Sequence, residues 1–122
     1  MNIRAITALL PHGLLFISDK GGGSVPYPWR DVMIQATPSC VCVRGVHEQE
    51  GTTEILVGPV DEVGLQAEPS FVGALKTANR AISFWTSDDR QLLEMAVPSH
   101  ITQVRIWLSH PKWPEKVIVG LK

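Results

Sequence analysis

The hydrophobic positions of this chain fall into short runs that are separated by turn-forming residues. Most runs are rich in β-branched or aromatic side chains, and the segments between them contain Gly, Pro, Asn, Asp and Ser. The runs occupy residues 3–10, 13–18, 39–44, 54–58, 71–77, 81–86, 92–97, 101–108 and 117–119. Short strands with turns at roughly even intervals are typical of sandwiches and partly open barrels. The pattern therefore predicts an all-β chain, an antiparallel β-sandwich of about eight or nine short strands.

The turns between runs suggest which strands are neighbours. A Pro-His-Gly turn separates residues 3–10 from residues 13–18, which predicts a first strand pair or one strand broken by a bulge. Residues 39–44 and 54–58 flank a polar stretch that contains one Gly, which predicts a hairpin. Residues 101–108 alternate, so Thr102, Val104, Ile106 and Leu108 share the face that is better suited to the core.

Little of the chain fits a helix. Residues 29–36 are the one stretch that fits a short helical turn, although an irregular crossover fits equally well, and Pro38 ends it. Residues 60–69 are acidic, contain Gly64 and Pro69, and predict a crossing loop. The length of 122 residues matches one domain, residues 1–122.

Composition and charge narrow the class of protein. Hydrophobic residues make up 44% and charged residues 19%, which argues against disorder. A net charge of -1 argues against a direct nucleic-acid binder. The first residues form neither a signal peptide nor a membrane span, so we expect a cytoplasmic protein without a membrane partner. Cys40 and Cys42 would share one face of a strand, too close for an unstrained disulfide, which predicts free buried thiols.

No set of residues predicts catalysis or metal binding. The four histidines, His12, His47, His100 and His110, all fall in turns or at strand ends, and no pair has ligand spacing. The two cysteines lack a second pair to complete a structural metal site. No nucleophile, base and orienting group can be nominated together. We therefore predict no catalytic residues, no metal and no cofactor, in a protein that is not an enzyme.

The acidic residues are concentrated in one segment. Residues 45–75 contain no Lys or Arg, and the segment lies between Arg44 and Lys76. Its carboxylates are Glu48, Glu50, Glu54, Asp61, Glu62 and Glu68. A local excess of negative charge favours a basic partner and speeds their encounter. The alternative is that the charges only keep one face solvated.

The four tryptophans divide into two kinds. Trp85 and Trp107 lie in predicted strands, where burial in the core is the simplest expectation. Trp29 and Trp113 each stand next to a proline in a loop. Such rigidly held aromatic residues can anchor an interface, or they can cover the open ends of a sandwich.

Several short motifs resemble the competence protein J family. Trp29-Arg30-Asp31, Gln35 and the strand at residues 39–43 are similar to the early segment of that family. Residues 70–72, 82–86 and 93–98 are similar to its closing half, so the resemblance spans most of the chain. It implies a β-rich, non-catalytic protein that inhibits a partner DNA nuclease. Relatives of this kind can also act as immunity proteins against nuclease toxins.

Charge and resemblance together predict an inhibitor or immunity protein that occludes the basic cleft of a nuclease or nuclease toxin. The six carboxylates would contact the partner, with Trp29 as an anchor, and the inhibitor would be a monomer or homodimer. Two alternatives remain open. One is a structural module of a phage or secretion assembly that forms a homo-oligomer through an open sheet edge. The other is a sandwich that binds a small molecule or sugar through Trp29 and Trp113.

Overall fold

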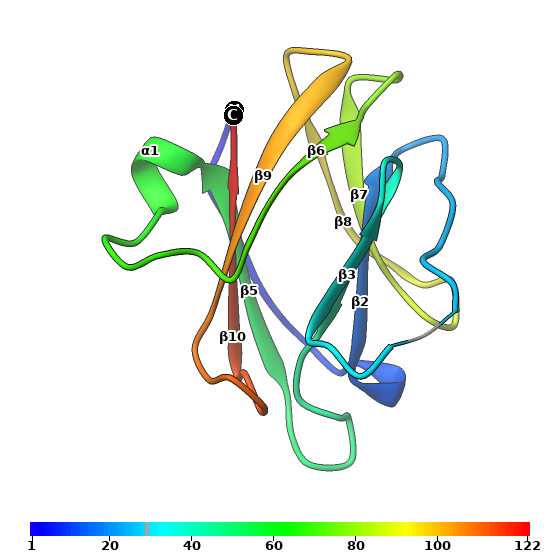
Figure 1. Ribbon diagram of the computed structural model, residues 1–122, viewed down its shortest axis with the longest axis vertical. Helices are drawn as coiled ribbons and strands as arrows, with labels where there is room; N and C mark the ends of the chain where they lie inside the picture. The colour runs from blue at the N-terminus through cyan, green and yellow to red at the C-terminus, as the bar shows by residue number, and fades with distance from the viewer. Residues whose placement is uncertain (29) are drawn as a thin grey trace.

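A computed structural model describes residues 1–28 and 30–122, and Trp29 lies outside the described residues. The described residues form ten strands in two five-stranded sheets that face each other, which confirms an all-β sandwich (Figure 1). The elements are β1 (Arg4–Ala8), a 3-10 turn (Pro11–Gly13), β2 (Leu14–Asp19), β3 (Ile34–Thr37), β4 (Cys40–Arg44), β5 (Thr53–Pro59), α1 (Val60–Val63), β6 (Phe71–Lys76), β7 (Ala81–Thr86), β8 (Gln91–Ala96), β9 (Ile101–Leu108) and β10 (Lys116–Leu121).

The first sheet has the strand order β1-β5-β10-β9-β6. Three of its pairs are antiparallel, and β5 and β10 are parallel. Because β1 and β10 lie on either side of β5, Arg4 and Val119 are both opposite Val57. Both β1 and β10 therefore place their outer ends, residues 4 and 121, at the same end of the sandwich.

The second sheet has the order β3-β4-β2-β7-β8, and all of its pairs are antiparallel. Alternate side chains of both sheets point inward and form one buried apolar cluster, which includes Leu15, Ile17, Val43, Phe84 and Ile106. Burial of this surface is the main source of stability. In β9, Thr102, Val104 and Ile106 are buried as the alternation predicts, and Leu108 is partly buried.

Both predicted local pairings are wrong. β1 pairs with β5 in the first sheet, whereas β2 pairs with β4 and β7 in the second. The two strands are neither a pair nor one bulged strand. The predicted hairpin fails in the same way, because β4 and β5 belong to different sheets. In each case the short connection crosses from one layer of the sandwich to the other.

The short helix lies elsewhere than predicted. Residues 34–37 form the edge strand β3, and an α-helical turn, α1, lies in the segment predicted to be a crossing loop. α1 begins directly after Pro59 and covers the outer face of the first sheet (Figure 1). There Val63 packs with Trp107 and Ile118 in a second apolar cluster. A Cβ on Gly120 would lie 3.0 Å from the Val60 side chain, so glycine allows the helix to approach the sheet.

The segment between β2 and β3 follows the outer side of the second sheet (Figure 1). We call its described part, residues 20–28 and 30–33, the strap. The Ser24 backbone N–H donates a hydrogen bond to Ser39 Oγ (2.8 Å), and Thr37 Oγ1 donates to the Ser24 carbonyl (2.6 Å). A Cβ on Gly23 would lie only 2.0 Å from the Ser39 carbonyl oxygen, so only glycine fits this approach. Among the described residues, no helix is long and apolar enough to cross a membrane.

Candidate protein-binding surface

The six carboxylates predicted to contact a partner fall into two groups, one at each end of β5. The group at the start of the strand, the end group, consists of Glu48, Glu50 and Glu54. The helix group consists of Asp61 and Glu62, in α1 at the other end of the strand, and Glu68, in the following loop, which returns along the outer face of the first sheet. Because a strand rises about 3.3 Å per residue, the start of β5 lies about 20 Å from the start of α1. The structure therefore does not bring the six carboxylates into one patch.

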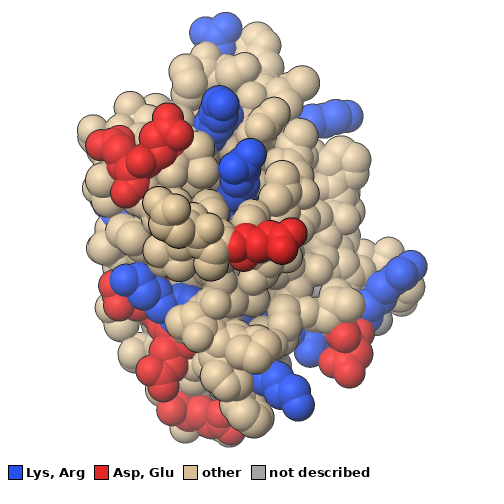
Figure 2. Space-filling view, turned by 60° about the vertical axis from the view of Figure 1, so that its left-hand side comes forward, with Lys and Arg blue, Asp and Glu red and all other residues tan. Residues whose placement is uncertain are grey.

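The molecule's own cations neutralise little of this charge. Among the described residues, one of the six carboxylates forms an ion pair, between Glu54 Oε1 and Lys116 Nζ at 3.7 Å. On the face that carries α1, acidic side chains form separate small groups with Lys and Arg between them (Figure 2). An alternating surface of this kind attracts a basic partner less strongly than one continuous acidic patch.

Glu50 of the end group lines a groove of about 1020 Å³, which we call the end groove. It opens at the end of the sandwich where β2, β5 and β10 begin, the lower end in Figure 1. Separate connections supply its lining: the 3-10 turn, the segment before β3, the loop between β4 and β5, and the loop between β9 and β10. The charged and aromatic side chains of the lining are His12, Asp31, Arg44, His47, Glu50, Lys112 and Trp113.

Trp113 is an exposed aromatic residue that its own loop holds in place. The residue is 61% exposed. Its indole ring stacks on the His110 ring, with 5.3 Å between the ring centroids. His110 Nδ1 accepts hydrogen bonds from the backbone N–H groups of Lys112 and Trp113, each at 3.0 Å. Pro114 is buried directly after Trp113. Of the two expectations for Trp113, this exposure favours an anchor over a cover for the core.

The charges of the end groove are nearly balanced. Asp31 lies 3.7 Å from Arg44, which also donates a hydrogen bond to the Arg30 carbonyl oxygen at 3.0 Å. Among the described residues, Glu50 has no such ion pair. The rings of His12 and His47 lie edge to face at 6.4 Å. Glu50 is therefore the lining carboxylate that is most available to a partner's cation.

Sequence reasoning found only part of this groove. The sequence predicts Glu50 as a partner-binding carboxylate and Trp113 as a possible interface anchor, but it does not indicate that the two line one groove. Asp31 and the two histidines were not nominated as partner-binding residues. The residues come from connections that are distant in the sequence, and only the crossing of chains between the two sheets brings them together. The one usable signal was the Pro-Lys-Trp-Pro segment, whose prolines restrict the loop that presents Trp113.

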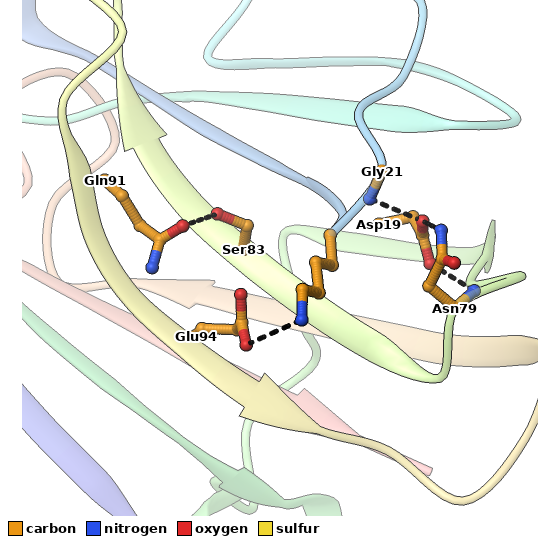
Figure 3. Close-up of polar contacts among 7 residues, drawn as sticks. Asp19, Gly21, Asn79, Ser83, Gln91 and Glu94 are labelled. Carbon is orange, nitrogen blue, oxygen red and sulfur yellow. Dashed lines mark hydrogen bonds and ion pairs between the residues drawn. The ribbon is translucent and has the colours of Figure 1, made fainter.

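A smaller groove of about 320 Å³ lies between the strap and the outer face of β7. Its polar groups mainly satisfy one another, as Figure 3 shows for Ser83, which donates a hydrogen bond to Gln91 Oε1 (3.2 Å). Lys20 lies 3.9 Å from Glu94 across the same region. Trp85, which lines this groove, is partly buried, stacks on Phe16 at 4.5 Å and donates to Ser18 Oγ. Of these contacts, the Lys20–Glu94 ion pair joins the strap to the sheet.

Asp19 is the most heavily hydrogen-bonded carboxylate in this region. Its oxygens accept bonds from the backbone N–H groups of Gly21 (2.8 Å) and Asn79 (2.9 Å) and from the Asn79 side chain (Figure 3). Burial by itself would raise the pKa of Asp19, but these hydrogen bonds outweigh it and hold the pKa below its ordinary value. A carboxylate so fully engaged joins two loops and is poorly placed to act on a ligand.

The two cysteines are free and buried, as predicted. They lie with Phe16 in a small cluster on the face of the second sheet opposite the core. Burial raises the pKa of the Cys40 thiol to about 11, and burial together with the neighbouring Cys40 raises that of Cys42 to about 12. Within the described part of the chain, no three His, Cys, Asp or Glu side chains form a group that could hold a metal ion.

Comparison with known proteins gives one informative result. No family model matches the sequence, and no curated protein matches it either. Among solved structures, the chain is similar to ComJ from Bacillus subtilis, described as an inhibitor of the DNA degrading activity of NucA. The similarity covers 97% of this chain and 93% of that chain, with a TM-score of 0.72 and 10% sequence identity. The resemblance inferred from the sequence motifs is therefore confirmed in three dimensions: this chain has the same fold as ComJ.

Proposed function

We propose that this protein binds and inhibits a nuclease or nuclease-type toxin without catalysing a reaction itself. The observation that carries the proposal is the shared fold over nearly the whole chain with ComJ, a protein described as a nuclease inhibitor. A fold alone does not determine a function, so the proposal also requires a surface that fits such a partner. The end of the sandwich that holds the end groove and the end group offers that surface.

The chemistry of this surface suits a protein that carries a basic cleft. Enzymes that cleave DNA use Lys and Arg to hold phosphates, so a complementary inhibitor presents carboxylates. The end group supplies three, and the exposed ring of Trp113 lies at the same end. The inhibitor would exclude DNA by occupying the cleft, and the carboxylates would speed its association. We assign this contact to the end group and not to the helix group, which lies at the other end of β5.

Affinity capture from the source cell followed by a DNA cleavage assay tests the proposal. A nuclease recovered on the immobilised protein is purified, and its cleavage of a fluorogenic DNA is measured against increasing inhibitor. We expect cleavage to stop near an equimolar ratio. Recovery of no nuclease, or of one that cleaves DNA equally fast with inhibitor present, would contradict the proposal.

Paired charge variants then test which surface makes contact. The double variant Glu48→Gln/Glu50→Gln removes two carboxylates of the end group, and Asp61→Asn/Glu62→Gln removes two of the helix group. We expect the first to slow association several-fold at low salt, and the second to leave the rate close to that of the unmodified protein. The opposite ranking would move the contact to α1.

A further inference from the structure

We propose that the end groove accepts an arginine side chain of the partner nuclease, stacked on Trp113 and paired with Glu50. This inference rests on the proposed function and names the chemical group that the surface recognises. The two side chains come from different loops, between β9 and β10 and between β4 and β5, and line the same groove. A flat aromatic ring and an available carboxylate therefore line one groove. A guanidinium group can stack on the ring and pair with the carboxylate.

The ring is prepared for this contact before a partner arrives. One face of Trp113 is covered by His110, and the residue as a whole is 61% exposed. The two backbone hydrogen bonds to His110 Nδ1 fix the loop, so binding costs little conformational entropy. Rigid, exposed tryptophans of this kind are the residues that most often dominate binding energy at protein interfaces.

The carboxylate is chosen by elimination among the neighbouring acids. Asp31 is already close to Arg44, and Glu54 is close to Lys116, each at 3.7 Å. Glu50 lines the groove and, among the described residues, makes no ion pair. A partner's cation in the groove would therefore meet Glu50 without first displacing a cation of this chain.

The other side chains that line the groove determine whether a substitution should weaken or tighten binding of the partner's arginine. Lys112 precedes Trp113 and lines the groove, so its ammonium group opposes an incoming cation. His12 and His47 also line the groove. Arginine is favoured over lysine because guanidinium is planar, stacks on aromatic rings and forms two parallel hydrogen bonds to one carboxylate.

The test measures the dissociation constant of the nuclease at pH 8 for single variants whose thermal unfolding is unchanged. We expect Trp113→Ala to weaken binding by about 10- to 30-fold, and Glu50→Gln by about 3- to 10-fold. Trp113→Phe keeps a stacking surface and should weaken binding less than Trp113→Ala. Lys112→Gln should tighten binding by about two-fold or more, because it removes a repulsive charge. Glu62→Gln, at the far end of β5, is the matched control and should change nothing.

A small probe separates this inference from the proposed function. The peptide amides Gly-Arg-Gly and Gly-Lys-Gly are titrated into the isolated protein while the indole N–H resonance of Trp113 is followed by NMR. The spectrum of Trp113→Phe lacks this resonance and so assigns it. The inference predicts a change in the chemical shift of this resonance that is larger with the arginine peptide than with the lysine peptide and is lost in Glu50→Gln.

If the nuclease is inhibited but the Trp113 and Glu50 variants bind it as tightly as the unmodified protein, the inference is wrong and the proposed function stands. If no nuclease is inhibited yet arginine shifts Trp113, the proposed function fails and the chemistry of the groove is supported.

Discussion

At the residue scale, Asp19 shows how a carboxylate can contribute to stability in a pH-dependent way. Its pKa is lowered in the folded state, so its contribution is fully present above its unfolded pKa of about 3.9 and is lost as pH falls through the folded pKa. We expect Asp19→Asn to reduce the free energy of unfolding at pH 7 by about 1–3 kcal/mol, because it weakens hydrogen bonds to a charged group. Urea unfolding at pH 7 and at pH 3 measures this, and the difference between variant and unmodified protein should shrink at pH 3. Asp31→Asn, on an exposed side chain, is the control, and an equal loss there would contradict the argument.

The cysteines allow a second prediction at this scale. With pKa values of about 11 and about 12, Cys40 and Cys42 are almost wholly protonated at pH 8, and both are buried. Since only the thiolate reacts, we expect both thiols to react with an aromatic disulfide reagent about two to three orders of magnitude more slowly in the native protein than after denaturation. Two thiols should become reactive in guanidinium chloride. Rapid labelling of the native protein would contradict this prediction.

At the scale of single elements, α1 depends on contacts that lie outside the main core. Trp107 packs with Val63 and Ile118 and donates a hydrogen bond from Nε1 to the Ala67 carbonyl oxygen at 2.8 Å. We expect Trp107→Phe to cost about 1–3 kcal/mol through the lost bond and the smaller ring. Hydrogen exchange should speed up most in residues 60–70. Trp113→Phe, on the exposed ring, should leave stability within about 0.5 kcal/mol, and an equal cost for both would contradict this assignment.

The elements also show what could be read from the sequence and what could not. The strands were predictable, because alternation and β-branched composition are local properties of each run. The pairings were not, because β1 and β5, or β6 and β9, are neighbours in the sheet but are separated by long stretches of chain. The single turn of α1 is too short to produce a helical period, and its stability comes from packing on Trp107. The strand β3 was missed because four residues between turns carry almost no alternation.

At the scale of the whole molecule, the acidic segment demonstrates the limit of charge read along a sequence. Residues 45–75 contain no cation, yet β5 carries the chain across the sandwich and divides the segment between two ends. The groove could not be foreseen for the same reason, since its lining comes from both sheets. The sequence-level nomination of Trp29 stays a prediction, because that residue lies outside the described part of the chain.

The whole molecule also makes a prediction about its size in solution. An inhibitor that fills a cleft with one end of the sandwich works as a single chain or a pair, whereas an assembly module would extend through its sheet edges. For a chain of 13.4 kDa, we expect light scattering to give that mass or about twice it. A large ring would favour the assembly alternative and weigh against the proposed function.

The positions of β1 and β10 on either side of β5 have a practical consequence for binding measurements on the immobilised protein. Residues 4 and 121 lie at one end of the sandwich, and the end groove opens at the other. A linker joined to either extremity of the chain would therefore hold the protein on a bead or sensor chip with the groove directed into the buffer. Attachment through the Lys112 amine would instead mask the groove, so random amine coupling would underestimate the binding capacity that an oriented tether preserves.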